Sequence, residues 1–183
     1  MSALTDFRLE KDEFFADNPQ SPLTPDQKKS FSGLSYFDEN PELDIKVDVR
    51  EFENKDEIVM QTSTGDVQRY RRYGKFSFEI AGERAELVIY AAPHGFFLPF
   101  VDSLANTETY GAGRYLDPEI LPNGRFHIDF NLAYNPYCAY NDLYSCPLTP
   151  FENRVKVAIR AGEKLPTGDW VDHGDPAHLS LDH

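Results

Sequence analysis

The sequence is poor in positive charge. Its 18 Lys and Arg are outnumbered by 31 Asp and Glu, which gives a formal net charge of −13 at pH 7. The densest basic cluster is RYRR at residues 69–72. A chain of this charge repels a phosphate backbone, so we expect no nucleic-acid partner.

Long apolar runs are missing as well. No segment approaches the roughly 20 apolar residues that span a bilayer. The N-terminus, MSALTDFRLEKDEFF, lacks the basic start, the apolar run and the small-residue cleavage site of a signal peptide. The sequence therefore predicts a soluble, cytoplasmic protein that makes no membrane contact.

Cysteine is scarce, and internal repeats are absent. Two cysteines are too few for a disulfide scaffold, and thiols are the default state in a reducing compartment. Whether Cys138 and Cys146 form a disulfide stays open at this point. With 183 residues, 40% of them apolar, the chain predicts one domain over residues 1–183 with a single core.

Helical patterning is confined to residues 1–33. Apolar groups recur there at helical spacing, at Leu4, Phe7, Lys11, Phe14 and Phe15. Lys11 contributes through the methylene groups of its side chain. A second, short helix is predicted from Thr24 as N-cap, Pro25 in the first turn and Gln27 as capping-box partner, with its end near Gly33.

A period of two then runs through residues 44–164. Strands are predicted over 44–51, 57–63, 67–74, 75–80, 85–91, 95–102 and 155–162, and a hairpin over 109–131. Asn123 and Gly124 should supply positive φ angles in the hairpin turn, and Pro99 should push its strand to a sheet edge or a bulge. The sequence thus predicts a mainly β fold, an antiparallel β-sandwich or open barrel with short N-terminal helices and a polar tail over 167–183.

One predicted strand, RFHIDFN at residues 125–131, has a chemically distinctive polar face. Its aromatic and aliphatic side chains take one face and leave His127, Asp129 and Asn131 on the other. The H-x-D spacing suits two ligands of one metal, or a base with its orienting partner. The alternative is a solvated sheet face, or one whose Asp129 binds the backbone of the following loop.

That loop, residues 132–154, is long for a compact domain. Its prolines and asparagines restrict the backbone, so we expect a rigid loop with a binding role. Seven residues separate Cys138 from Cys146, which misses the usual zinc spacing. A metal held by both cysteines with His127 and Asp129 is one hypothesis, and buried apolar thiols or a loop-locking disulfide are the others. Neither Lys nor Arg neighbours Cys138, so nothing in the sequence predicts an acidic nucleophilic thiol.

Tyrosines gather in the same loop. Tyr134, Tyr137, Tyr140 and Tyr144 predict either an aromatic wall for a planar ligand or sugar, or a buried cap on the core. In TYGAGRYL, Arg114 is a candidate anion clamp. His94 lies on a turn and should be solvated. We expect ligand contacts from Arg114, Asp129, Asn131, Asn135, Tyr137, Tyr140 and Asn153.

Three stretches resemble a known family. YGAGRYL, the run DFNLAYNPYCAYNDLYSCPLTPFENRVKVAIRAGE and FRLEKDEFF with SPL, spanning residues 7–164, are similar to the uncharacterised bacterial and archaeal DUF1684 proteins. The resemblance matches Gly113-Arg114-Tyr115, Asp129-Phe130-Asn131, Cys138 and Cys146 to family motifs, and it implies no activity. His127 lies outside those motifs, which argues against a metal site that depends on it.

Three functional hypotheses follow. The first is a small-ligand-binding β-domain whose pocket lies at the 125–131 strand and the 132–154 loop. The second is a metal-dependent hydrolase, in which a divalent metal held by His127 and Asp129 activates water. The third is a purely structural module, with a homodimer interface left open.

Overall fold

The computed structural model describes residues 2–167. The predicted polar tail lies outside the described residues, apart from Thr167. Two helices come first, as predicted. Helix α1 (Ala3–Asp17) begins where the Ser2 side chain accepts a hydrogen bond from the Thr5 N–H, and it buries Phe15. None of the described helices is long and apolar enough to cross a bilayer.

The second helix, α2 (Pro25–Ser30), contains the predicted capping box. The Thr24 hydroxyl accepts from the Gln27 N–H, and the Gln27 side chain accepts from the Thr24 N–H. The helix ends three residues before Gly33, which adopts a φ of 120°. The local signals in the sequence therefore placed both helices.

The larger sheet is antiparallel and has six strands. Its order is β2-β4-β5-β6-β7, with β3 paired to β4 beside β2. The strands are β2 (Arg50–Glu51), β3 (Glu57–Gln61), β4 (Val67–Ile80), β5 (Glu83–Ala92), β6 (Gly95–Phe100) and β7 (Arg114–Leu116). The segments 67–74 and 75–80, predicted separately, form the single strand β4, with an irregularity between Arg72 and Gly74.

A smaller sheet has the order β1-β9-β8. Its strands are β1 (Asp44–Val47), β8 (Glu119–Ile120) and β9 (Phe126–Asp129), and η1 (Pro41–Leu43) precedes β1. Phe126 and Ile128 of β9 join Phe76 and Leu87 of the larger sheet in the main core. The fold is therefore mainly antiparallel β, as predicted, and the sheets do not close into a barrel.

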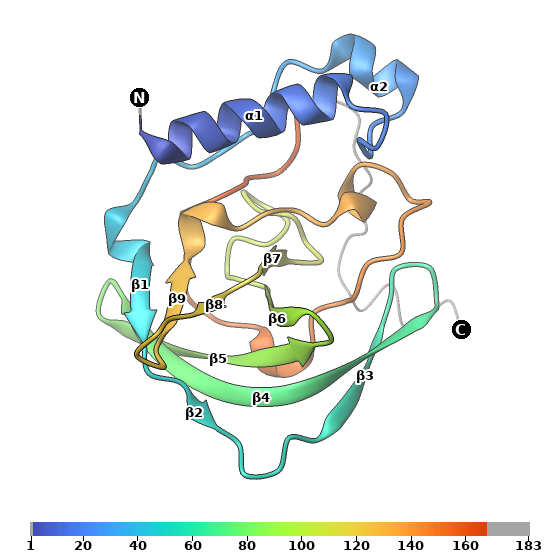
Figure 1. Ribbon diagram of the computed structural model, residues 1–183. Helices are drawn as coiled ribbons and strands as arrows, with labels where there is room; N and C mark the ends of the chain where they lie inside the picture. Colours follow the sequence, from blue (N-terminus) through green and yellow to red (C-terminus); the bar gives the residue numbers. More distant parts are fainter. Residues whose placement is uncertain (1, 168–183) are drawn as a thin grey trace.

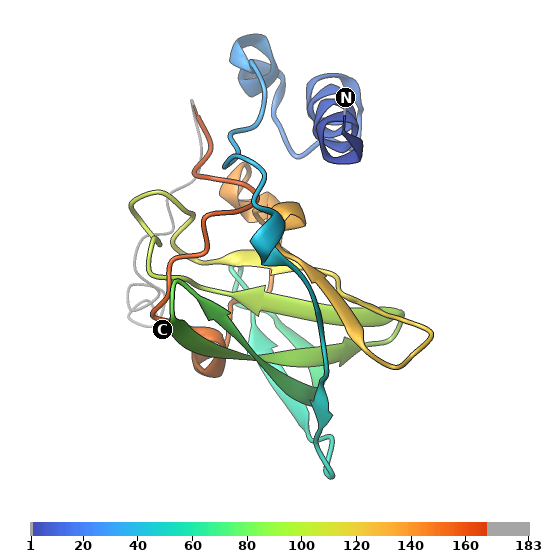
Figure 2. The same ribbon diagram turned by 90° about the vertical axis from the view of Figure 1, so that its left-hand side faces the viewer.

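Figure 1 shows the helices at one end of the molecule and the curved strands β4 and β5 at the other. The segment after β9 lies between them, and the view in Figure 2 shows the same order of layers. This middle segment therefore separates the helices from β4 and β5.

The predicted hairpin over 109–131 is wrong in its extent. The hairpin joins only β8 and β9, while Arg114–Leu116 pairs with β6 in the larger sheet. Gly124 has the predicted positive φ of 84°, whereas Asn123 does not. The turn needs a single left-handed residue, and glycine adopts that conformation at the lowest cost.

The predicted strand over 155–162 does not form. Val157 and Ile159 are buried as expected, but the backbone makes only single bonds to 101–103, from the Val155 N–H to the Val101 C=O and from the Ser103 N–H to the Val157 C=O. Pro99 lies in β6, between β5 and β7, and not at an edge or bulge. The β5–β6 ladder ends at Phe97, so the missing proline N–H is not needed there.

Candidate functional site

The loop after β9 is organised by three single-turn 3-10 helices. These are η2 (Phe130–Leu132), η3 (Tyr137–Ala139) and η4 (Phe151–Asn153). Tyr134 exchanges two backbone hydrogen bonds with Tyr115 of β7, at 2.8 and 3.0 Å, and the Leu148 N–H donates to the Gln61 carbonyl of β3 at 2.8 Å. The loop backbone is thus tied to β7 and to β3 of the larger sheet.

A cleft with a volume of about 730 Å³, here named the α1 cleft, opens between α1 and this loop. Its lining is mostly aromatic and includes Phe7, Phe14, Phe15, Tyr134, Tyr137 and Tyr144. Three of the four tyrosines of the predicted wall therefore meet in one cleft. The fourth, Tyr140, is buried behind it, where its ring packs edge to face on Phe15 at 5.2 Å between centroids.

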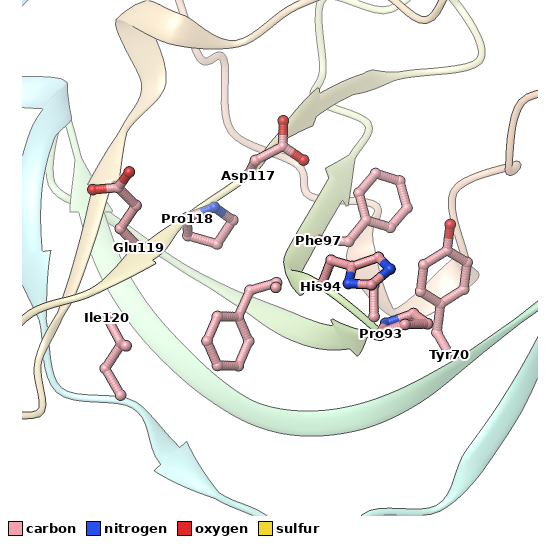
Figure 3. A pocket seen from close by; sticks show the side chains of 11 residues that line it. Tyr70, Pro93, His94, Phe97, Asp117, Pro118, Glu119 and Ile120 are labelled. Atoms are coloured by element: carbon pink, nitrogen blue, oxygen red, sulfur yellow. The ribbon is translucent and has the colours of Figure 1, made fainter.

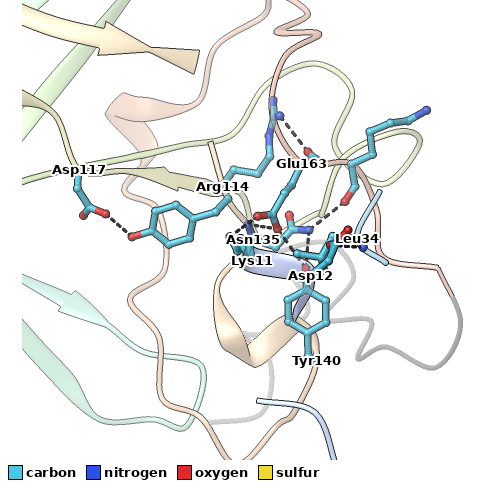
Figure 4. A network of polar contacts seen from close by, with 10 residues as sticks. Lys11, Asp12, Leu34, Arg114, Asp117, Asn135, Tyr140 and Glu163 are labelled. Atoms are coloured by element: carbon cyan, nitrogen blue, oxygen red, sulfur yellow. Dashed lines mark hydrogen bonds and ion pairs between the residues drawn. The ribbon is translucent and has the colours of Figure 1, made fainter. Parts of the chain in front are cut away.

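An ion pair lies beside this cleft (Figure 4). Lys11 of α1 binds the carboxylate of Glu163, which is 1% exposed. The same carboxylate accepts hydrogen bonds from the Asn135 N–H at 3.1 Å and the Tyr140 hydroxyl at 3.2 Å. The Lys11 ammonium also lies 5.1 Å from the ring centroid of Tyr134, a distance at which a cation is attracted to an aromatic face.

The two cysteines are in contact. Both are free and buried, and the Cys138 N–H donates to the Cys146 sulfur at 3.4 Å. Cys146 lines the α1 cleft, and Cys138 packs behind it with Met60, Val88 and other apolar residues. The thiols are therefore neighbours without a disulfide between them.

A second cleft, named the β9 cleft, has a volume of about 390 Å³ and adjoins the first. His127 and Asp129 line it, and it shares Phe7 and Tyr134 with the α1 cleft. The Tyr134 hydroxyl donates to the Asp117 carboxylate at 2.7 Å, and burial, with this carboxylate, raises the pKa of the phenol. Where the sequence predicted a single pocket at the strand and the loop, the structure has two adjoining clefts.

His127 and Asp129 meet a third potential metal ligand, the carboxylate of Asp44, in the small sheet. One ligand atom from each of Asp44, His127 and Asp129 lies within 4.8 Å of the others. Asp44 is the cross-strand partner of Asp129, and its carboxylate binds the His127 ring nitrogen. Across residues 2–167 this is the one such group, and neither cysteine belongs to it. The four-residue set His127, Asp129, Cys138 and Cys146 is therefore split between two places.

Asp129 and Asn131 also bind backbone. Asp129 accepts from the Asn131 N–H at 3.0 Å and from its side-chain amide at 2.9 Å. The Asn131 amide in turn exchanges two hydrogen bonds with the Asn40 backbone, at 2.8 and 2.9 Å. This arrangement matches the alternative in which Asp129 holds the following loop.

Arg114 lies in the interior and lines none of the clefts described here. It is 1% exposed, and its guanidinium donates to the carbonyls of Ile159, Ala161 and Glu163. Asp102 pairs with it at 3.6 Å. Burial lowers the pKa of Arg114 to about 10, against the pull of Asp102 and Glu163, so the group stays charged at neutral pH.

Gly113, the residue before Arg114, allows the backbone to place Arg114 in the interior. Gly113 has a φ of 103°, and a Cβ there would lie 2.7 Å from the Phe100 carbonyl oxygen. Only glycine fits both constraints, so the chain enters β7 close against β6.

Asn153 is likewise internal, at 0% exposure, and bonds only to backbone: to both polar groups of Val88 and to the Pro99 carbonyl. Asn135 is buried beside Glu163. Of the ligand contacts expected from sequence, the structure brings Tyr137 to the α1 cleft and Asp129 to the β9 cleft.

A third opening, the β6 cleft, has a volume of about 710 Å³ (Figure 3). His94 lies on the exposed turn between β5 and β6, as predicted, near Tyr70 and Phe97, whose rings stack at 5.2 Å. Asp117 and Glu119 lie on the opposite wall. Sequence reasoning missed this cleft because no local motif joins β4, β6 and β8.

Comparisons with known proteins agree with the resemblance seen in the sequence. A family model described as a protein of unknown function, DUF1684, matches residues 29–164. The solution NMR structure of the uncharacterised protein from gene locus rrnAC0354 of Haloarcula marismortui is similar, with 37% identity and a TM-score of 0.66, over 88% of this chain and 91% of that one. None of the curated proteins matches the chain significantly.

Proposed function

Because the chain belongs to the DUF1684 family, whose function is unknown, we propose a function from the α1 cleft: the protein is a small-molecule-binding β-domain. The observation that carries the proposal is the gathering of aromatic side chains from α1 and the loop around one opening. Its volume of about 730 Å³ falls within the roughly 300–1,000 Å³ of small-molecule sites. We also propose a cytoplasmic location, because a reducing compartment keeps neighbouring thiols such as Cys138 and Cys146 free.

The lining also indicates the ligand class. Tyr137 and Tyr144 pack edge to face at 5.3 Å, which leaves ring surfaces for a flat molecule. The charge of Lys11 is balanced by Glu163, so the cleft has no unpaired cation for a strongly anionic ligand. The expected ligand is planar, largely apolar and of low net charge.

Truncating Tyr144 should weaken binding of such a ligand. We expect Tyr144→Ala to lower affinity about tenfold, the loss of one aromatic contact. A panel of planar metabolites would first be screened by the rise in melting temperature, and affinities then measured by calorimetry. Phe151→Ala is the matched control, because Phe151 is 87% exposed and outside the cleft. A panel without any stabilising compound would contradict the proposal.

The Asp44, His127 and Asp129 group favours a second candidate, a divalent-metal site of a hydrolase. Two carboxylates directly opposite on paired strands repel each other, and a cation between them removes that repulsion. An imidazole and two carboxylates are ligands that Zn²⁺ and Mn²⁺ accept. The β9 cleft would hold the substrate beside a metal-activated water.

This candidate predicts stabilisation by metal. Stoichiometric Zn²⁺ or Mn²⁺ should raise the melting temperature of the chelator-treated protein, and His127→Ala should abolish the shift. His94→Ala should leave it intact, because His94 lines the β6 cleft and not the β9 cleft. Elemental analysis of the purified protein checks the same point, and equal shifts in both variants would remove the metal hypothesis.

A further inference from the structure

Neither proposed function uses the chemistry of the two cysteines. The thiols share a hydrogen bond, and the backbone N–H of Cys138 also points at the Cys146 sulfur. Two thiols in hydrogen-bond contact can be oxidised to one disulfide. The pair lies at the wall of an open cleft and not in the middle of the main core.

The two thiols differ in access. Cys146 is 8% exposed and lines the α1 cleft, whereas Cys138 is 2% exposed and lies behind it. The hydroxyls of Ser63 and Tyr110 contact the Cys138 thiol. A reagent that enters the cleft therefore meets Cys146 first.

The two thiols also differ in acidity. The hydrogen bond from Cys138 lowers the pKa of Cys146 to about 7, against the effect of burial, and the N–H groups of Cys138 and Tyr137 add to the lowering. The same thiol–thiol hydrogen bond, together with burial, raises the pKa of Cys138. A thiol with a pKa near the ambient pH is the most effective attacking group in disulfide exchange.

We propose that Cys146 and Cys138 form a thiol–disulfide exchange site for small organic disulfides that enter through the α1 cleft. Cys146 is the attacking thiol, and Cys138 is the resolving thiol. The aromatic walls favour disulfides with flat or apolar arms. The proposal shares its entrance with the proposed ligand site, and in that respect it rests on that function.

The exchange has two steps. The Cys146 thiolate attacks one sulfur of the organic disulfide, the disulfide bond breaks, and the first organic thiolate leaves and takes a proton. Cys138 then loses its proton and attacks the Cys146 sulfur, which releases the second organic thiol. The organic disulfide is reduced to two thiols, and the protein dithiol is oxidised to one disulfide.

The probe for the test is 4,4′-dithiodipyridine, whose flat arms suit the cleft. With native full-length protein we expect two thiopyridone molecules per chain, no residual adduct, and a mass lower by about two hydrogens. Cys138→Ser should release one thiopyridone and keep one pyridyl adduct. Cys146→Ser should react about 100-fold more slowly than Cys138→Ser.

The pH profile supplies a second readout. Tyr70, Tyr110, Tyr115 and Tyr137 face the pair, with Glu10 and Lys11 across the cleft. Burial raises the pKa of the Tyr70, Tyr115 and Tyr137 phenols, so they stay protonated near pH 7. The rate should rise as pH increases through about 7 and level off above it, following the Cys146 thiolate.

Equal rates for Cys138→Ser and Cys146→Ser, or two stable adducts on the wild type, would overturn the proposal. So would a wild type that reacts only in denaturant. Thermal melting shows that each variant is folded, and Cys138→Ala and Cys146→Ala replace any serine variant that is not. A failed metabolite screen with intact exchange would refute the ligand proposal alone, and the reverse result would refute the exchange site alone.

Discussion

Replacing Arg114 by methionine is expected to destabilise the fold by about 3 to 5 kcal/mol, the cost of removing one partner of a buried charge pair. Methionine keeps the apolar stem and removes the guanidinium. The carbonyls of Ile159, Ala161 and Glu163 then lose their donor, and Asp102 loses its cation. Denaturant unfolding followed by fluorescence measures the change in the free energy of unfolding.

Arg69→Met is the matched control for this variant. Arg69 pairs with Glu57 on the surface, with 71% of its side chain exposed, so its loss should cost less than about 1 kcal/mol. Arg114→Lys should recover only part of the stability, since one ammonium cannot replace a planar fork that serves three carbonyls. A cost below about 1 kcal/mol for Arg114→Met would show that these contacts do not hold the 159–163 segment.

Asn153→Ala should have the next largest effect, a loss of about 3 kcal/mol. The Asn153 amide accepts from the Val88 N–H and donates to the Val88 and Pro99 carbonyls, all at 2.8 Å. The β5–β6 ladder ends at Phe97, and beyond it the Asn153 side chain makes hydrogen bonds to the backbone that a paired strand would otherwise make. Alanine would leave three buried backbone groups without partners, and each such group carries a desolvation cost.

Asn123→Ala is the control for this second variant. Asn123 is exposed, and its side chain accepts one hydrogen bond in the β8–β9 turn, so its loss should cost under about 1 kcal/mol. Asn153→Asp should be as damaging as alanine, because a carboxylate cannot donate to the Val88 and Pro99 carbonyls. Near-equal stabilities of Asn153→Ala and Asn123→Ala would contradict this role.

Much of the β architecture was predictable because it depends on local patterns. The capping box at Thr24, the alternation in the second half of β4 and the glycine turn at Gly124 each need only a few neighbouring residues. Residues 155–162 show where that reasoning ends. They alternate like a strand, but the Ile159 N–H bonds to the Asp102 side chain and the carbonyls around it bond to Arg114, so no neighbouring strand is required.

The candidate site likewise has features that the sequence predicted and features that only the tertiary structure reveals. Three tyrosines of the loop meet in the α1 cleft as one sequence hypothesis held, because they lie close together in the chain. Lys11 and Glu163 are 152 residues apart, and no pattern in either segment marks them as partners. Asp44 reaches His127 only through the pairing of β1 with β9.

The amino-acid order was sufficient for the mainly β class, the two helices and the family. It could not assign roles to individual polar residues, since Arg114 and Asn153 look the same in sequence whether they bind a ligand or buried carbonyls. Folding settles that question, because a polar group removed from water must bond to whatever the packed chain places beside it. The same packing puts Cys146 at the cleft wall and Cys138 behind it, a difference on which the proposed exchange depends.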